Sequence, residues 1–133
     1  MTPIQTSERI PPALAQAIAH AASRLDENIP LQTLADLAGL SLWRFSIVFR
    51  RHFGVPPHRY IGQLRIARAR ELLLQGMSAA AVADACGFYD QSHFSRHFKS
   101  ACGVTPGQFA ADVARGLRED DAGPAPMTLG APR

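Results

Sequence analysis

A short stretch of sequence occurs twice in this chain, as LADLAG at residues 34–39 and as VADACG at residues 82–87, 48 positions apart. Downstream positions also recur, but at an offset of 49: Phe45, Phe49, Gly54, Val55, Pro57 and Tyr60 match Phe94, Phe98, Gly103, Val104, Pro106 and Phe109. The second copy therefore has one extra residue in its turn. Each copy combines a short helix, a tight turn with glycine and a second helix. This is the helix-turn-helix pattern, duplicated.

Proline, glycine and capping residues predict where the helices begin and end. Ser41 and Asp90 are placed to cap the second helix of each copy, and Gly39 is placed to end the first helix of copy one. No segment alternates as a half-buried strand does, so we expect an all-α fold with about seven helices. Their expected ranges are residues 12–25, 31–38, 42–53, 57–75, 79–86, 91–101 and 106–113.

The composition allows one domain with a hydrophobic core, because the chain has 133 residues and 47% of them are apolar. No apolar run approaches the roughly 18 residues of a membrane span, and the start is too polar for a signal peptide. Two cysteines make no disulfide scaffold. We expect a cytoplasmic protein that does not associate with membranes.

Basic residues are concentrated in the middle of the chain. Residues 41–70 contain seven arginines and no acidic residue, although the whole chain has a net charge of only +3. Such an excess favours a polyanionic partner. Composition alone is equally consistent with arginines that only lie on solvent-exposed helix faces.

Helical periodicity separates a packed face from an open face in the second helix of each copy. In residues 42–53 the packed face carries Phe45, Val48 and Phe49, and the opposite face carries Trp43, Ser46, Ile47 and Arg50. In residues 91–101 the packed face carries Phe94, Phe98 and Ala101, and the opposite face carries Ser92, Arg96 and Lys99. A guanidinium in the middle of a helix suits a bidentate contact with guanine in a major groove.

The sequence resembles a known family at several places. The run GFYDQSHFSRHFK at residues 87–99, followed by GVTPGQF at residues 103–109, is similar to the signature of AraC/XylS-type bacterial transcription regulators. Residues 34–54 and RIARARELL at residues 65–73 are also similar to the DNA-binding domain of that family. The resemblance implies two helix-turn-helix subdomains joined by a long linker helix, with helices 42–53 and 91–101 in successive major grooves.

Composition predicts a flexible leader (1–10) and a disordered tail (114–133), and the resemblance makes residues 11–113 an AraC-type DNA-binding domain. Within the domain, subdomain one covers residues 11–56, the linker helix residues 57–75 and subdomain two residues 76–113. A linker of this length spans roughly 28 Å, close to the ~34 Å between successive major-groove faces. One departure from the family is Ile47, where stand-alone members carry arginine.

These observations predict two sets of DNA-contacting residues. Candidates for base edges are Trp43, Arg44, Ser46, Ile47, Gln91, Ser92, His93 and Arg96. Candidates for phosphates are Ser41, Arg50, Arg51, Arg59, Arg65, Ser95 and Lys99.

The expected function is sequence-specific binding of double-stranded DNA in transcription regulation. The alternative is a helical protein-interaction module that docks a partner such as RNA polymerase through the face formed by Trp43 and Ile47. No catalytic pattern is present, so we expect no enzyme and no cofactor. His93 and His97 have the i, i+4 spacing of two metal ligands but no third ligand, so we expect no metal. We also expect no small-molecule sensor domain in this chain, because only about a dozen residues precede the first helix.

Overall fold

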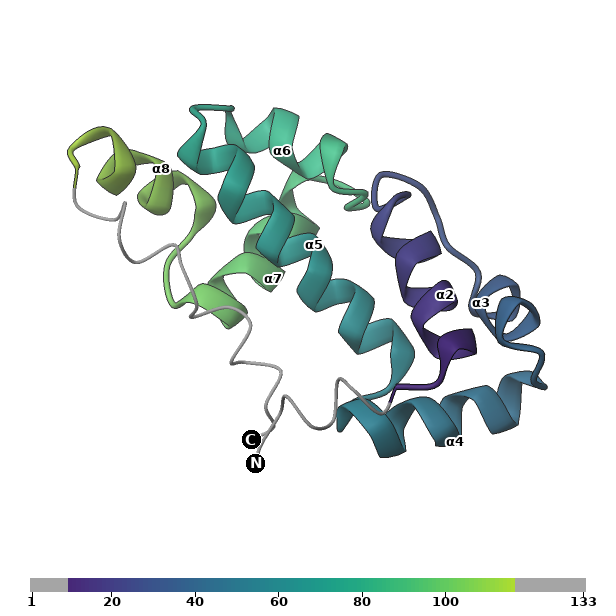
Figure 1. Ribbon diagram of the computed structural model, residues 1–133. Coiled ribbons are helices and arrows are strands. Elements are labelled where there is room, and N and C mark those ends of the chain that lie inside the picture. The colour runs from purple at the N-terminus through teal and green to yellow at the C-terminus, as the bar shows by residue number, and fades with distance from the viewer. Residues whose placement is uncertain (1–9, 117–133) are drawn as a thin grey trace. The chain divides into compact units, whose positions relative to one another are not determined.

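The computed structural model describes residues 10–116, and this part of the chain contains seven helices and no strand (Figure 1). The all-α prediction is confirmed. The predicted leader (1–10) and tail (114–133) fall almost wholly on residues outside this range. The helices are α2 (Pro12–Ala22), α3 (Leu31–Ala38), α4 (Leu42–Phe53), α5 (Pro57–Leu74), α6 (Ala79–Ala85), α7 (Gln91–Cys102) and α8 (Pro106–Ala114).

The first helix is shorter than the sequence predicts. A helix over residues 12–25 was expected, but α2 ends at Ala22 and a turn follows. The Ser23 hydroxyl donates a hydrogen bond to the His20 carbonyl at 2.9 Å, a local bond that competes with continuation of the helix. The other helices end within one residue of their expected positions.

Side-chain caps start the second helix of both repeats. Ser41 Oγ accepts a hydrogen bond from the Arg44 backbone N–H at 3.1 Å, and Asp90 Oδ1 accepts one from the His93 backbone N–H at 2.7 Å. Both predicted caps are confirmed. Each cap contributes about 1 kcal/mol to the stability of its helix and fixes where the helix begins.

The helices form two compact units, each with its own core, and the chain passes from one unit to the other between residues 61 and 62, inside α5. The core of unit 1 contains the buried side chains of Leu14 in α2, Leu34 in α3, and Phe45 and Phe49 in α4. Tyr60, at the start of α5, extends this core, because its ring lies 5.4 Å from that of Phe49.

Unit 2 has a core of aliphatic and aromatic side chains from α5, α6, α7 and α8. The ring of Phe98 lies 5.6 Å from that of Phe94 and 5.5 Å from that of Phe109, both in edge-on contact. Arg70 is also buried, and its guanidinium carbon lies 5.3 Å from the centre of the Phe109 ring.

Unit 2 also includes residues 25–28, which follow α2 in the sequence. The side chain of Arg65 in α5 donates one hydrogen bond to the Leu25 carbonyl at 3.1 Å and another to the Glu27 carbonyl at 2.8 Å. Gly87 lies beside the same carbonyl, because a Cβ atom there would be only 2.0 Å from the Leu25 oxygen. The backbone at Gly87 has φ of +81°, so both its conformation and its surroundings require glycine.

Candidate nucleic-acid interface

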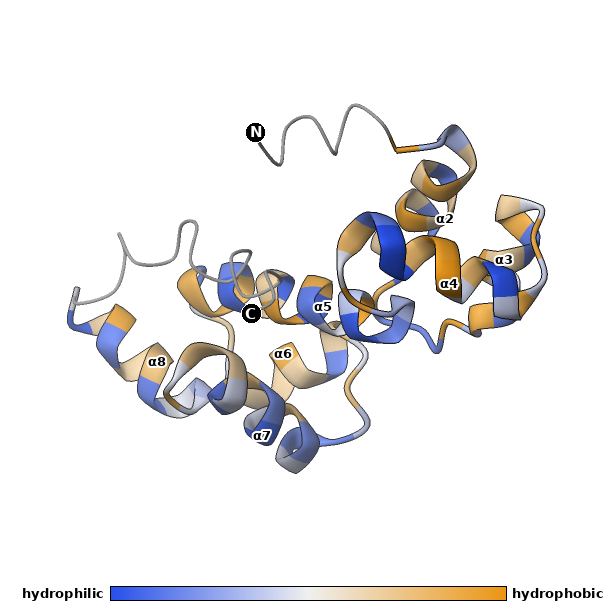
Figure 2. Cartoon of the chain, turned by 90° about the horizontal axis from the view of Figure 1, so that it is seen from below, coloured by the Kyte–Doolittle hydropathy of each residue, from blue (hydrophilic) through white to orange (hydrophobic). Residues whose placement is uncertain are grey.

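Helix α4 separates a packed face from an open face as its periodicity predicts. Phe45 and Phe49 are fully buried, whereas Trp43 is 74% exposed and Ile47 39% exposed. Figure 2 shows the alternation of strongly hydrophilic and strongly hydrophobic residues along this helix. An exposed tryptophan on an ordered helix is a large apolar surface that a binding partner can cover.

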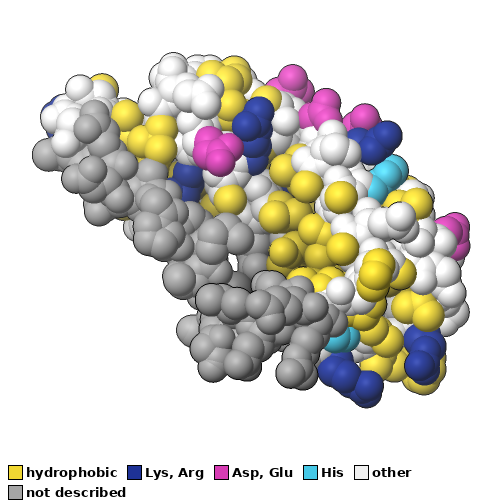
Figure 3. Space-filling view, in the orientation of Figure 1, with side chains coloured by type: hydrophobic (Ala, Val, Ile, Leu, Met, Phe, Trp, Pro, Cys, Tyr) yellow, Lys and Arg dark blue, Asp and Glu magenta, His cyan; other side chains and the backbone are white. Residues whose placement is uncertain are grey.

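The open face of α4 is basic as well as apolar. Arg44, Arg50 and Arg51 are all exposed, Ser46 is half-buried, and the helix contains no acidic residue. Lys or Arg side chains lie over α4 next to hydrophobic side chains in Figure 3. This combination can hold phosphate oxygens through the guanidinium groups and apolar parts of a ligand through Trp43.

Helix α7 is the matching helix of the second unit. Phe94 and Phe98 are fully buried, and Gln91, Ser92, Arg96 and Lys99 are exposed. Ser95 is half-buried, and α7 also contains no acidic residue. Arg96 lies in the middle of the open face, where a major-groove helix makes its base contacts.

His93 differs from the other predicted base contacts because it takes part in packing. Its ring is half-buried and lies 4.4 Å from that of His97 and 5.9 Å from that of Phe88. Its Nδ1 atom is buried and has no hydrogen-bond partner among the described residues. Burial lowers the pKa of the exposed neighbour His97, and the charges of His93 and Arg96 lower it further.

Most predicted phosphate contacts are also exposed. Arg59 at the start of α5 is exposed, as are Arg50, Arg51 and Lys99. Ser41 is exposed, although its hydroxyl already caps α4. The assignment of these residues to phosphates stays a prediction.

Arg65 has a different environment from the other arginines of this set. It is half-buried, and its guanidinium binds the carbonyls of residues 25 and 27. Burial lowers the pKa of its guanidinium below the usual range for arginine. These bonds give Arg65 a structural role that the basic run 41–70 did not reveal.

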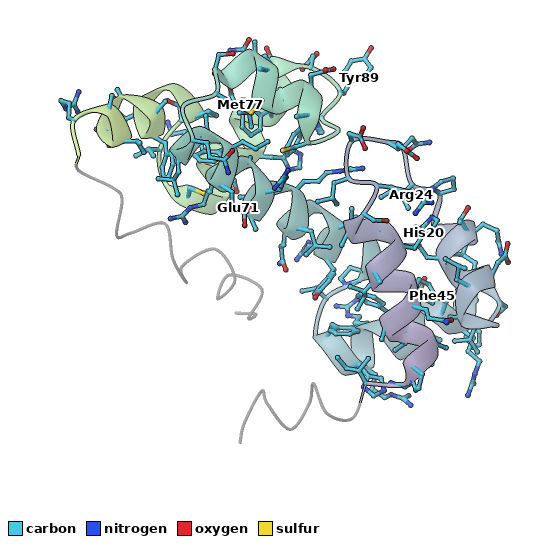
Figure 4. The ribbon with its side chains drawn as sticks, turned by 45° about the horizontal axis from the view of Figure 1, so that its top comes forward. His20, Arg24, Phe45, Glu71, Met77 and Tyr89 are labelled. Carbon is cyan, nitrogen blue, oxygen red and sulfur yellow. The ribbon has the colours of Figure 1, made fainter. Side chains whose placement is uncertain are left out.

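Tyr89 is an exposed residue of this region that the predicted sets do not include. It lies in the turn before α7, it is 90% exposed, and its side chain points away from the ribbon in Figure 4. The change in repeat offset from 48 to 49 was the signal in the sequence that marked this turn.

Two further properties limit what the described residues can do. No group of three or more His, Cys, Asp or Glu side chains between residues 10 and 116 could hold a metal ion. No helix in the same range is long and apolar enough to cross a membrane.

Comparison with known proteins identifies the family. A family model described as a helix-turn-helix domain matches residues 34–112, more than half of the chain. Over 96 residues the chain is 35% identical to the HTH-type transcriptional regulator GbdR of Pseudomonas aeruginosa, covering 71% of this chain and 26% of that protein. Over 94 residues it is 34% identical to the HTH-type transcriptional activator RhaS of an Enterobacter species, covering 70% and 34%. The chain thus spans about a quarter to a third of these relatives.

Solved structures agree with the sequence matches. An AraC-type transcriptional regulator from Chromobacterium violaceum has a TM-score of 0.72 and 30% identity, covering 78% of this chain and 94% of that one. The DNA-binding domain of AdpA, solved in complex with a target DNA, has a TM-score of 0.75 and 29% identity, covering 80% and 97%. The chain belongs to the AraC/XylS family of helix-turn-helix DNA-binding domains, and the predicted resemblance is confirmed.

Proposed function

We propose that this chain binds double-stranded DNA with sequence specificity and regulates transcription, with α4 and α7 entering successive major grooves. The observation that carries this proposal is the pair of helices with buried phenylalanines on one face and exposed basic or polar side chains on the other. The relatives support it, because GbdR and RhaS are transcriptional regulators and the AdpA domain was solved on DNA.

The two helices have different chemistry for reading bases. Arg96 of α7 is shaped for bidentate hydrogen bonds to guanine O6 and N7, and Gln91 is shaped for adenine. Ile47 and Trp43 of α4 suit apolar contact with a thymine methyl group or a sugar. Arg44, Arg50, Arg51, Arg59 and Lys99 supply five exposed positive charges for phosphates.

The proposal assigns binding rather than catalysis, and a cytoplasmic location follows from action on a bacterial chromosome. A partner protein such as RNA polymerase on the face formed by Trp43 and Ile47 is the less supported alternative. Nothing in the geometry of the described residues selects it over DNA, whereas the arginines next to Trp43 favour a polyanion.

The test is a titration of the 133-residue chain with a fluorescent duplex at several salt concentrations. Five phosphate contacts predict a slope of about −4.5 in log K against log salt. A slope flatter than about −2 would contradict binding across two grooves. Selection of bound sites from random duplexes then measures specificity, and complete absence of binding at low salt would favour the protein-docking alternative.

A further inference from the structure

The two helix-turn-helix turns can be aligned residue by residue. The backbone N–H of Leu40 donates to the Ala35 carbonyl at 3.0 Å, and that of Phe88 donates to the Ala83 carbonyl at the same distance. Leu40 and Phe88 are therefore equivalent and 48 positions apart. The caps Ser41 and Asp90 are also equivalent, because each accepts a hydrogen bond from the backbone N–H three residues later.

This alignment identifies Tyr89 as the inserted residue of the second turn. Between the glycine and the cap, copy one has only Leu40, whereas copy two has Phe88 and Tyr89. Phe88 does the packing, because its ring lies 4.8 Å from that of the buried Phe94. The Tyr89 side chain makes no hydrogen bond and no ring contact with the rest of residues 10–116, so the fold does not require its phenol.

The position of Tyr89 relates it to the DNA strand beside the groove. It precedes the first residue of α7 by two positions. The N-terminal residues of a recognition helix face the base edges, so side chains just before them meet the sugar-phosphate backbone at the edge of the groove. Tyrosine hydroxyl groups are among the neutral donors that bind phosphate oxygens there.

We propose that Tyr89 is a positioning residue that holds the start of α7 on the DNA by donating a hydrogen bond from its hydroxyl to a backbone phosphate. This inference rests on the proposed function. Copy one has no counterpart, so the contact would fix the register of α7 independently of α4. That register matters for Gln91 and Arg96, whose bidentate contacts need accurate placement.

The test compares Tyr89→Phe with the wild-type chain on the selected duplex and on a mixed-sequence duplex. Loss of one hydrogen bond from a neutral donor to a charged phosphate should weaken binding about ten- to a hundred-fold on both, with an unchanged salt slope, because a neutral donor releases no counterion. Tyr89→Arg serves as the rescue variant. It should restore affinity and steepen the slope by about one. Both variants should unfold at the wild-type midpoint, because position 89 is exposed.

A methylphosphonate scan of the duplex locates the partner. When one particular phosphate near the start of α7 is neutralised, the wild-type chain and Tyr89→Phe should bind the duplex with equal affinity. Wild-type affinity in Tyr89→Phe would overturn the inference, and so would a loss confined to duplexes with one particular base pair. Failure of the wild-type chain to bind any duplex would instead refute the proposed function, and the role of Tyr89 with it.

Discussion

Replacement of Gly87 by alanine tests the contact between residues 25–28 and the rest of unit 2. The substitution places a Cβ atom 2.0 Å from the Leu25 oxygen, which real structures do not tolerate. The carbonyl must therefore move, and it is the acceptor for Arg65 Nε at 3.1 Å. Gly103 provides a matched control in the same unit, because its φ is +85° and a Cβ atom there would meet nothing within 4 Å.

Both variants lose free energy of unfolding through backbone strain, and only one of them also loses it through a hydrogen bond. Alanine in the left-handed region costs about 1–2 kcal/mol at either position. Only Gly87→Ala also disturbs a hydrogen bond from a charged donor, which is worth about 1.5–3 kcal/mol. We expect Gly103→Ala to lose about 1–2 kcal/mol in free energy of unfolding and Gly87→Ala to lose about 2.5–5 kcal/mol.

Urea unfolding of the whole chain, followed by circular dichroism, measures both losses. Arg65→Gln adds a second comparison, because it removes the same hydrogen bond from the donor side. The double variant with Gly87→Ala should lose less than the sum of the two single losses. Equal losses in Gly87→Ala and Gly103→Ala, or strict additivity with Arg65→Gln, would refute the reasoning.

Three further predictions concern the interface and two side chains of unit 2. Arg96→Ala should cost ~1–3 kcal/mol of binding free energy and relax the preference at one G·C position. Ile47→Ala should cost less and weaken a preference for thymine. Binding to duplexes with single-base changes measures both effects, and equal weakening on all duplexes by Arg96→Ala would contradict the prediction. Burial raises the pKa of Cys86 to about 11. At pH 8 only about 0.1% of this thiol is thiolate. In a Cys102→Ser variant, a thiol reagent should therefore label Cys86 only when the chain unfolds. Rapid labelling of Cys86 in the folded chain would disprove this prediction. The pKa of His97 lies below its usual 6.5 in the folded chain. The unfolded chain then binds the proton first, so stability should fall as the pH drops below about 6.5, and this fall should be smaller in His97→Gln.

The helices and their open faces could be predicted from the sequence because the signals are local. Buried phenylalanines four residues apart fix the rotation of α4 and α7, and this places Trp43 and Arg96 on the exposed side. The end of α2 was predicted three residues too late, because the helical pattern continues through Leu25. The carbonyl of Leu25 is taken up by a side chain forty positions away, which no local pattern records.

The structural role of Arg65 could not be predicted from the sequence. In the sequence Arg65 is one of seven arginines in a run without acidic residues, and it was predicted to contact phosphate together with Arg50, Arg51 and Arg59. Its partners in the structure are backbone carbonyls, and every residue carries one of these. His93 is a similar case, because its packing against Phe88 depends on the turn before α7.

Equivalent positions in the two copies of the repeat do not always have the same surroundings or the same side chain. Equivalent positions share a backbone conformation, so Gly39 and Gly87 both have positive φ, yet only Gly87 is in close contact with another segment. Tyr89 and Arg96 also distinguish copy two, because copy one has no residue equivalent to Tyr89 and has Ile47 at the position of Arg96. All three differences lie in copy two. Arg96 gives α7 a bidentate donor, and Tyr89 adds a polar group just before this helix, so we expect α7 to contribute more to specificity than α4.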